Sequence, residues 1–443
     1  MKHTVNVANE APGSALKRGI PHPANGKIAQ LADAPRPSMS YNGTMEAPTA
    51  GAVSEHTMTS KERVLAAIGG RPVDRAPVMY WLNPHTACRL LAGEQPGRSR
   101  AANLLARFLW QRFTRGGGLE AGVWTRAAPL LLEEYGNGPY VLALGADVAI
   151  LSPEIISPSA FIRSVRTENG RLRVRGPFGV GMALGGIYMD PVEPAVKGVE
   201  DLAGVQLPEV SERHFAGVRR FRRAHPDACL LVEVASFQQL LCDYILGTTP
   251  FMLALYDAPG AVAAFLERMA DWIMQWIKHA AAAGADVAYL QDDYGCNDRP
   301  LISMKMWREL TYPHLGRMVR AAHKVGLPFM LHSCGYQMPF LEHYVAAGVD
   351  ALQSFQPKAG NDFETAYDRY GDRMAFATGI DIQRGEWMAP QELRDDILRS
   401  YEIGRRKGRH ILSMTHMMQY TMPPENVRAI LATVRDIQSG RHG

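Results

Sequence analysis

LPFMLHSCG, at residues 327–335, is the stretch from which the whole chain can be interpreted. Its first five residues are apolar, and it ends in His332, Ser333, Cys334 and Gly335. A short apolar run of this kind is typical of a strand buried on both faces of a parallel sheet. Residues i and i+2 of a strand point to the same side, so His332 and Cys334 can face one point. The stretch therefore predicts a buried strand that ends in two soft ligands for a metal or a substrate.

Similar apolar runs recur along the chain and alternate with helical patterns. Together with 329–334, the runs lie at residues 77–81, 146–151, 229–234, 287–292, 351–356, 374–381 and 410–416. Between the later runs, apolar residues recur every three or four positions at 262–276, 303–325, 337–347, 390–407 and 424–438, as in amphipathic helices. Eight such units predict a (β/α)8 TIM barrel. A doubly wound sheet is the alternative, although no run is followed by a phosphate-type glycine fingerprint.

The chain is longer than the roughly 250 residues typical of that barrel, and the surplus lies in two places. Residues 1–58 are rich in Ala, Pro, Gly, Asn, Ser and Thr, which predicts a flexible or partner-wrapping extension outside a barrel domain at 59–443. Such an arm also hints at a homodimer. The sequence FIRSVRTENGRLRVRGPFGV, at 161–180, predicts a β-hairpin that turns at Glu168-Asn169-Gly170 and is inserted near the barrel mouth.

Composition excludes several other classes of protein. The 443 residues are 47% hydrophobic and 21% charged, with a formal net charge of only +4 and no basic run with interleaved aromatics, so nucleic acid is not an expected partner. Five scattered cysteines do not form a disulfide framework and fit a reducing cytoplasm. No apolar run approaches the roughly 18 residues of a membrane helix. A cytoplasmic protein without membrane contact is expected.

The strand ends carry candidate metal ligands, and in such a barrel the active site lies at the C-terminal ends of the strands. Zinc prefers sulfur and nitrogen ligands, and its catalytic sites keep one coordination position open. We therefore expect His332, Cys334 and His416 to bind zinc, with Glu233 or an exogenous thiol as the fourth ligand. Substrate contact or polar packing in the core is the alternative role for His332 and Cys334.

Three aspartates at strand ends are the expected catalytic carboxylates. Asp292 and Asp293 follow the strand VAYLQ, and Asp381 ends the run ATGID. Each can act as an acid or base, or can orient a ligand histidine. The competing role for Asp292 and Asp293 is to cap the next element or to pair with Arg299.

The expected substrate-binding residues lie at the same ends. Tyr80, Trp81 and Asn83 stand at the end of the first run, and Gln356 at the end of the sixth. Met414 belongs to a methionine-rich stretch that offers a pliable apolar lining, although such methionines also serve plain packing.

Three blocks of the chain resemble the uroporphyrinogen decarboxylase superfamily. They are SKERVLAAIGGRPVDRAPV at 60–78, the block from DDYGCNDRP to ALQSFQP at 292–357, and GRHILSMTHMMQYTMPPENVRAI at 408–430. The resemblance extends over residues 60–436 and implies a (β/α)8 barrel, in agreement with the count of apolar runs.

The resemblance favours one branch of that superfamily. True uroporphyrinogen decarboxylases work without metal and hold their substrate with arginines of an R-Q-A-G-R-Y segment, where this chain reads MYWLNPHTACRLLAGE. Corrinoid-linked methyltransferases of the superfamily bind zinc through H-x-C and a later Cys. His332 and Cys334 match the first two positions. His416 stands where the later Cys would fall, and decarboxylases also carry a His there.

The resemblance thus implies a zinc-dependent methyltransferase that moves a methyl group between a corrinoid and a small methyl ether, amine or thiol. Because the chain has no D-x-H-x-x-G corrinoid-binding signature, the corrinoid (cobalamin) is expected on a partner protein. Two competing functions remain. One is a metal-free decarboxylase for a different substrate, with Asp292 or His416 handling protons. The other is a non-catalytic barrel that binds a tetrapyrrole or corrinoid.

Overall fold

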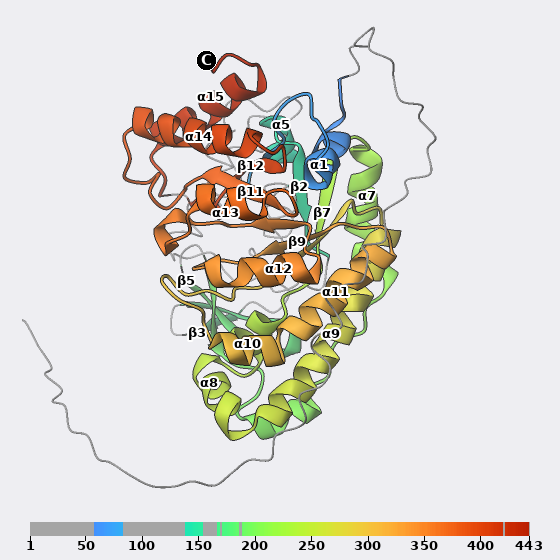
Figure 1. The fold of residues 1–443 in the computed structure, drawn as a ribbon. Coiled ribbons are helices and arrows are strands. Elements are labelled where there is room, and N and C mark those ends of the chain that lie inside the picture. Colours follow the sequence, from blue (N-terminus) through green and yellow to red (C-terminus); the bar gives the residue numbers. More distant parts are fainter. Residues whose placement is uncertain are drawn as a thin grey trace, which may run out of the picture. The chain divides into compact units, whose positions relative to one another are not determined.

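The computed structural model describes residues 57–82, 138–153, 166–168, 171–185, 188–419 and 421–442. Its centre is a sheet of eight parallel strands in the order β1-β12-β11-β10-β9-β8-β7-β2, with helices around it (Figure 1). The strands are β1 (Val78–Met79), β2 (Val148–Leu151), β7 (Cys229–Glu233), β8 (Val287–Gln291), β9 (Phe329–His332), β10 (Ala351–Gln353), β11 (Ala375–Ile380) and β12 (His410–Met414). Each of the eight expected runs contains one of these strands, so the predicted barrel is confirmed.

Alternate residues of the strands fill the inside of the barrel, because successive side chains of a strand point to opposite faces. The buried inner cluster consists of Met79, Val148, Ile150, Cys229, Leu231, Val287, Tyr289, Met330, Ala351, Ala375, Ala377 and Ile411, with Val64, Ala67 and Ile68 of helix α1 (Ser60–Gly69). Because α1 joins this cluster, it packs against the interior rather than only around it. The outward-pointing residues pack against the other helices in separate clusters.

Besides α1, the described part of the chain contains ten α-helices, and the six at 259–282, 304–310, 312–324, 341–347, 390–405 and 424–438 lie where the apolar periodicity predicts them. The ten helices are α5 (Pro139–Ala143), α7 (Ala216–Ala224), α8 (Thr248–Asp257), α9 (Pro259–Ala282), α10 (Met304–Leu310), α11 (Tyr312–Lys324), α12 (Leu341–Ala347), α13 (Phe363–Tyr370), α14 (Pro390–Arg405) and α15 (Pro424–Gln438). Shorter helical turns are η1 (Pro177–Gly179), η2 (Val199–Gly204), η3 (Glu212–Phe215), η4 (Leu240–Ile245), η5 (Met338–Phe340) and η6 (Pro357–Ala359). The helix expected at 303–325 is interrupted at Thr311, because Pro313 has no N–H with which to continue the ladder.

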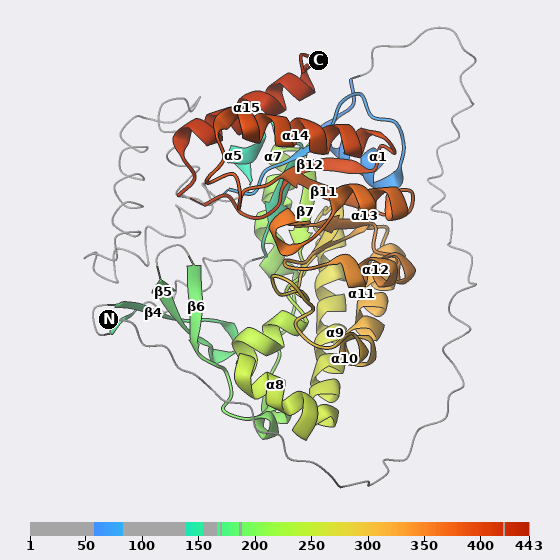
Figure 2. The same cartoon turned by 60° about the vertical axis from the view of Figure 1, so that its left-hand side comes forward.

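A second, antiparallel sheet is inserted after β2. It contains β3 (Arg166–Glu168), β4 (Arg171–Arg175), β5 (Gly181–Gly185) and β6 (Tyr188–Glu193), in that order (Figure 2). The β3–β4 pair confirms the predicted hairpin, and two further strands extend it. After β6, the amides of Ala195 and Val196 donate to the carbonyls of Tyr244 and Ile245, which follow the C-terminal end of β7. The insertion is therefore attached at the mouth of the barrel.

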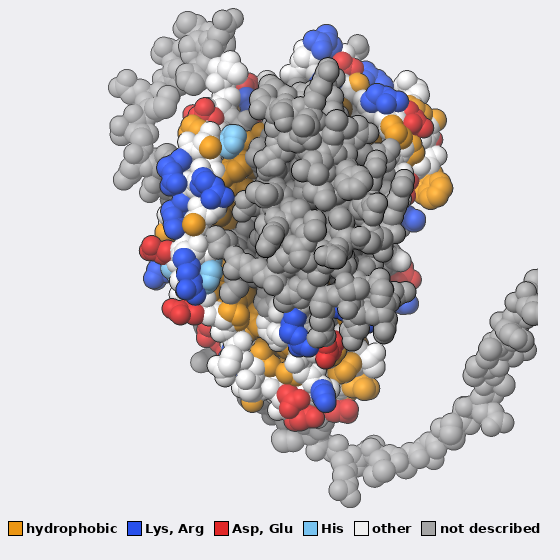
Figure 3. All heavy atoms as spheres, turned by 180° about the vertical axis from the view of Figure 1, so that it is seen from behind, with side chains coloured by type: hydrophobic (Ala, Val, Ile, Leu, Met, Phe, Trp, Pro, Cys, Tyr) orange, Lys and Arg blue, Asp and Glu red, His pale blue; other side chains and the backbone are white. Residues whose placement is uncertain are grey.

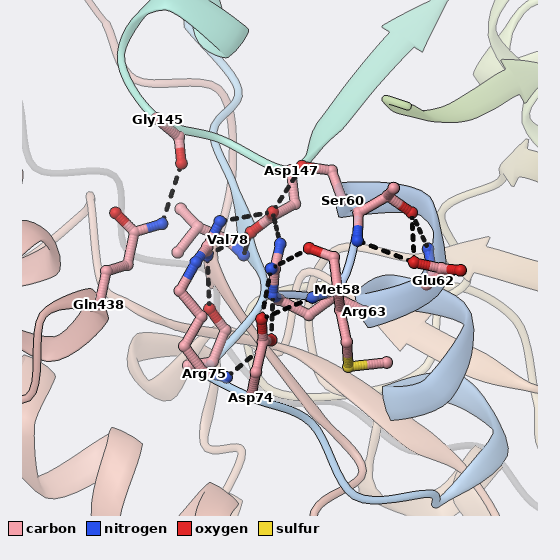
Figure 4. A network of polar contacts seen from close by, with 12 residues as sticks. Met58, Ser60, Glu62, Arg63, Asp74, Arg75, Val78, Gly145, Asp147 and Gln438 are labelled. Atoms are coloured by element: carbon pink, nitrogen blue, oxygen red, sulfur yellow. Dashed lines mark hydrogen bonds and ion pairs between the residues drawn. The ribbon is translucent and has the colours of Figure 1, made fainter. Parts of the chain in front are cut away.

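The barrel closes between β1 and β2 through Asp147, as Figure 4 shows. The Asp147 amide donates to the Val78 carbonyl (2.8 Å), and the Val78 amide donates to the Asp147 carboxylate (2.9 Å). Arg63, Arg75 and Ser60 also donate to this carboxylate, at 2.6 to 2.8 Å. A buried charge held by so many donors fixes the first strand against the second at the end of the barrel opposite the mouth.

Two joints between a helix and the following strand have near-identical sequences, Ala-Gly-x-Asp, and the same architecture. In Gly284-Ala285-Asp286, the carboxylate accepts the amide of Leu230 (2.9 Å) at the start of β7. In Gly348-Val349-Asp350, it accepts the amide of Phe329 (2.7 Å) at the start of β9. Each aspartate therefore ties the first or second residue of the preceding strand, as Asp147 ties Val78.

Some expectations concern residues outside the described ranges. Residues 1–56, most of the expected extension, and Asn83 are among them. In the part of the chain that is described, no single helix is long and apolar enough to cross a membrane. Helices α8 and α9 meet that criterion only as a pair, and the chain bends by 117° between them.

Candidate metal centre

A polar layer lies directly above the apolar interior, at the C-terminal ends of the strands. On six strands, the residue two positions after the last inward-facing apolar residue also faces inward. These six residues are Trp81, Ser152, Glu233, Gln291, His332 and Gln353. Their side chains belong to the same face of the sheet as the inner cluster. The mouth of the barrel is thus built over this polar layer.

His332, Cys334 and His416 form one cluster in this layer. A ligand atom of each lies within 4.8 Å of the ligand atoms of the other two. Nε2 of His332 is 3.3 Å from Sγ of Cys334. His332 ends β9, Cys334 follows it by two residues, and His416 follows the end of β12. Two imidazoles and a thiol thus converge on one point, as the sequence predicts for metal ligands.

Gln353 determines which nitrogen His332 presents to this point. The Gln353 side-chain amide donates to the carbonyl of Met414 (2.9 Å), so its oxygen remains to accept. That oxygen accepts from the hydroxyl of Tyr289 (3.0 Å) and contacts Nδ1 of His332. Nδ1 therefore carries the proton, and the lone pair of Nε2 faces Cys334.

Ser354 joins the two loops that carry the cluster. Its hydroxyl donates to the carbonyl of Thr415 (2.6 Å) and lies 3.2 Å from Sγ of Cys334. Ser354 adopts a φ of 78°, in the left-handed region that few residues other than glycine occupy. A strained backbone at such a position persists only where the surrounding structure holds it. Ser354 therefore links Cys334 to the residue that precedes His416.

Trp81 and Asp293 flank the cluster. The Trp81 ring stacks on His416 (5.2 Å between centroids, 26° between planes) and meets His332 edge-on at 5.2 Å. An Asp293 oxygen accepts the amide of Cys334 (2.7 Å) and lies 3.6 Å from Nε2 of His332. Asp293 thus positions the Cys334 loop and places negative charge beside the cluster, whereas Trp81 forms an apolar wall.

Burial shifts the pKa of each residue in the cluster. It lowers the pKa of His416 to about 4, and the neighbouring His332 adds to the effect. It also lowers the pKa of His332 and raises the pKa of the Cys334 thiol, an effect that Asp293 increases. Both imidazoles are therefore neutral and able to act as ligands at neutral pH. A cation at this point would favour the thiolate of Cys334.

The structure places the other expected catalytic carboxylates in structural contacts. Asp292 is fully buried and accepts three consecutive amides, those of residues 237–239, at 2.7 to 3.1 Å. Burial raises the pKa of Asp292 to about 7, although these hydrogen bonds act in the opposite direction. Asp381 accepts the amides of Gln383 and Arg384 and the Arg384 guanidinium. Both oxygens of each carboxylate accept such hydrogen bonds, so Asp292 and Asp381 hold loops in place. Asp292 therefore caps backbone amides, as in the alternative role considered from the sequence, but the amides belong to the loop after β7 and not to the element that follows Asp292.

Glu233 also lies apart from the cluster. Its oxygens accept hydrogen bonds from Ser152 and Gln291, and it is not among the three residues whose ligand atoms converge. The role of fourth metal ligand expected for Glu233 thus has no support from these contacts.

The structure places three of the expected substrate-binding residues in other contacts. Tyr80 and Met414 belong to the cluster between the barrel and its outer helices. Met79, Trp81 and Ile411 point into the barrel, and since side chains of a strand alternate between its two faces, Tyr80 and Met414 point outward. The side chain of Gln356 accepts the amide of Gly335 (2.9 Å) and holds the loop after Cys334. Of the described residues in that set, Trp81 contacts the cluster.

Two residues that support the cluster were not assigned a role from the sequence. Gln353 stands at a strand end and could have been selected by the same rule that selected His332. Ser354 carries no such signal, because its left-handed φ and its contact with Cys334 arise from the tertiary structure.

A (β/α)8 barrel with convergent ligands at the C-terminal ends of its strands is the architecture of an enzyme. The chain belongs to the uroporphyrinogen decarboxylase family, because the family model "Uroporphyrinogen decarboxylase (URO-D)" matches residues 178–437. Curated relatives named uroporphyrinogen decarboxylase include one from Pelobacter propionicus, 24% identical over 84% of this chain and 98% of its own length. Another, from Alkalilimnicola ehrlichii, is 24% identical over 87% of this chain and 96% of its own length.

A similar solved structure is described as a methyltransferase from Methanosarcina mazei. It matches with a TM-score of 0.59 and 17% sequence identity, over 86% of this chain and 99% of that chain. At this identity the likeness establishes the fold, in agreement with the eight-stranded barrel.

Proposed function

We propose that this protein is a zinc-dependent methyltransferase that moves a methyl group between a small substrate and a corrinoid carried by a partner protein. The observation that supports it is the convergence of His332, Cys334 and His416 within 4.8 Å at the barrel mouth. The small substrate is a methyl ether, amine or thiol. The similar fold of the methyltransferase from Methanosarcina mazei is consistent with this proposal.

The donor set fits a catalytic zinc ion. Two imidazole nitrogens and one thiolate are ligands that zinc prefers, and three protein ligands leave one position open for substrate. Gln353 fixes His332 in the tautomer that directs Nε2 toward the cluster, as the outer partners of metal-bound histidines do. A metal bound there would supply Lewis acidity, which stabilises a thiolate or polarises the atom that bears the methyl group.

The residues around the cluster have separate tasks in this function. Ser354 holds the thiol of Cys334 at a fixed distance from the loop of His416. Asp293 fixes the Cys334 backbone. Trp81 covers one side of His416 and limits the access of water to the cluster.

The decarboxylase function remains the second candidate, because the curated relatives bear that name. It has less support from the residues themselves. The chain lacks the R-Q-A-G-R-Y segment of true decarboxylases, and the Asp292 carboxylate is fully buried and held by three backbone amides. Of the converging side chains, His416 has a proton-handling task in a metal-free decarboxylation, but the thiol of Cys334 has none.

Metal analysis of the purified full-length protein tests the proposal. We expect about one zinc per chain in the wild type and a loss in Cys334→Ser and His332→Ala. Cys296→Ser is the matched control, because Cys296 lies in a neighbouring loop and outside the cluster, and it should keep its zinc. A folded wild type without metal would refute the zinc site.

Transfer itself is tested with methylcobalamin and a thiol acceptor, followed by the change in cobalamin absorbance. Wild type and Cys296→Ser should be active, and Cys334→Ser inactive. Release of carbon dioxide from a tetrapyrrole carboxylate by protein free of metal would instead establish the decarboxylase.

A further inference from the structure

Within the described part of the chain, the Glu233 carboxylate at the mouth has hydrogen bonds but no ion pair. It lies in the polar layer at the end of β7, where Ser152 of the β2 end donates to one oxygen and Gln291 of the β8 end donates to the other. Both donors are neutral. Across the described residues, no lysine, arginine or histidine forms an ion pair with it, and no cation is among the influences on its pKa.

The other carboxylates of the mouth are compensated. Asp381 pairs with Arg384 at 2.5 Å. Asp292 accepts three amides, and Asp293 accepts the Cys334 amide beside the imidazole of His332. Burial raises the pKa of Glu233, because an ionised carboxylate is unfavourable where water is largely excluded and none of the described residues supplies a counter-charge. Glu233 is nevertheless only partly buried, so a ligand in the mouth can reach it.

An aromatic side chain belongs to the same layer as this carboxylate. Trp81 follows β1 by two residues, and β2 alone separates β1 from β7 around the barrel, a spacing of about 10 Å from two strand separations. The indole of Trp81 is also partly buried and belongs to the same inward-facing layer. Aromatic faces attract cations, and most strongly where water is excluded. The Glu233 carboxylate and the Trp81 indole therefore belong to one layer of the mouth, where they present a negative charge and an aromatic face, the two features that attract a small organic cation.

We propose that Glu233, together with Trp81, binds the positively charged head of the substrate, an ammonium or quaternary ammonium group, beside the metal cluster. The proposal rests on the proposed function for the fate of the substrate, and it narrows the substrate class to those methyl ethers, amines or thiols that carry a positively charged ammonium group. Glu233 is then a substrate-binding residue rather than a fourth metal ligand, consistent with its position outside the cluster.

Two molecules of the same shape and different charge provide the test: choline and its uncharged carbon isostere, 3,3-dimethylbutan-1-ol. Isothermal titration of the purified full-length protein should show that the wild type binds choline at least about tenfold more tightly than the isostere. Glu233→Gln, which keeps the shape of the side chain, should abolish this preference. Asp350→Asn, the matched control at a carboxylate that precedes β10 and lies at the end of the barrel opposite the mouth, should keep it.

Equal binding of the two molecules by the wild type, or a preference unchanged in Glu233→Gln, would overturn the inference. The wild-type comparison stands alone if the variant fails to fold, which circular dichroism reports. Zinc content measured on the same samples separates this inference from the proposed function. A preference for choline in metal-free protein supports the binding site alone, and zinc without the preference supports the metal site alone.

Discussion

Replacing Asp147 with asparagine removes the charge at the closure of the barrel while it keeps the shape of the side chain. The Asp147 carboxylate is fully buried and accepts from two guanidinium groups, one hydroxyl and one amide (Figure 4). Removing one partner of a buried ion pair typically destabilises a protein by about 3 to 5 kcal/mol. Arg63 keeps Asp74 as a partner at 2.6 Å, and Arg75 is partly exposed, so both charges are still compensated in part. We therefore expect a loss of about 2 to 4 kcal/mol.

Urea unfolding followed by tryptophan fluorescence and by circular dichroism measures this loss. Asp350→Asn is the matched control, because its carboxylate occupies the equivalent joint but is 26% exposed and has the His323 side chain and one amide as partners. It should lose no more than about 1 kcal/mol. An Asp147→Asn protein as stable as the wild type, or no less stable than Asp350→Asn, would refute the closure argument.

Two further substitutions test the loops of the candidate site. In Gly335→Ala, the added Cβ would lie 2.4 Å from the Gly295 carbonyl, which is backbone and cannot move aside, at a φ of 77°. We expect the free energy of unfolding in urea to fall by more than about 3 kcal/mol, together with lower zinc content. Gly326→Ala is the control, because its φ is 79° and none of the described neighbouring atoms lies within 4 Å of the added Cβ, and it should lose only about 1 to 2 kcal/mol. Equal losses in the two variants would exclude the clash. The pKa of His416 falls from its ordinary 6.5 to about 4 in the folded protein. Between these pH values the unfolded chain therefore binds more protons than the folded protein. Metal-free protein should consequently lose stability as the pH falls from about 6.5 to about 4. His416→Gln should flatten the pH dependence of the urea midpoint, with a residual slope from His410, whose pKa burial also lowers to about 4; an unchanged slope would contradict the assignment.

The strands and the first two candidate ligands followed from local patterns in the chain. Buried parallel strands need continuous apolar runs, and these runs are visible in the sequence without knowledge of the fold. The two-residue spacing of His332 and Cys334 also fixes their common direction, since alternation along a strand is a local property. The repeated Gly-x-Asp joints were equally visible, although the amide that each carboxylate binds was not.

Tertiary structure alone decided which strand ends meet and which side chains face the mouth. Asp292 was indistinguishable from a catalytic acid until the structure showed three amides of another loop on its carboxylate. Tyr80 and Trp81 are neighbours in the chain, and only the register of the barrel shows that Tyr80 points outward and Trp81 inward. Ser354 reaches Cys334 through a left-handed backbone that its residue type does not indicate.

The stretch at 327–335 illustrates the limit. It specified two candidate ligands, because their relative geometry depends on the few bonds between them. The third, His416, is more than eighty residues further along the chain and joins them only because β12 lies three strands from β9 in a closed barrel. Distances across a barrel depend on strand order, register and closure, which are set by the packing of the whole chain and not by any one segment of it.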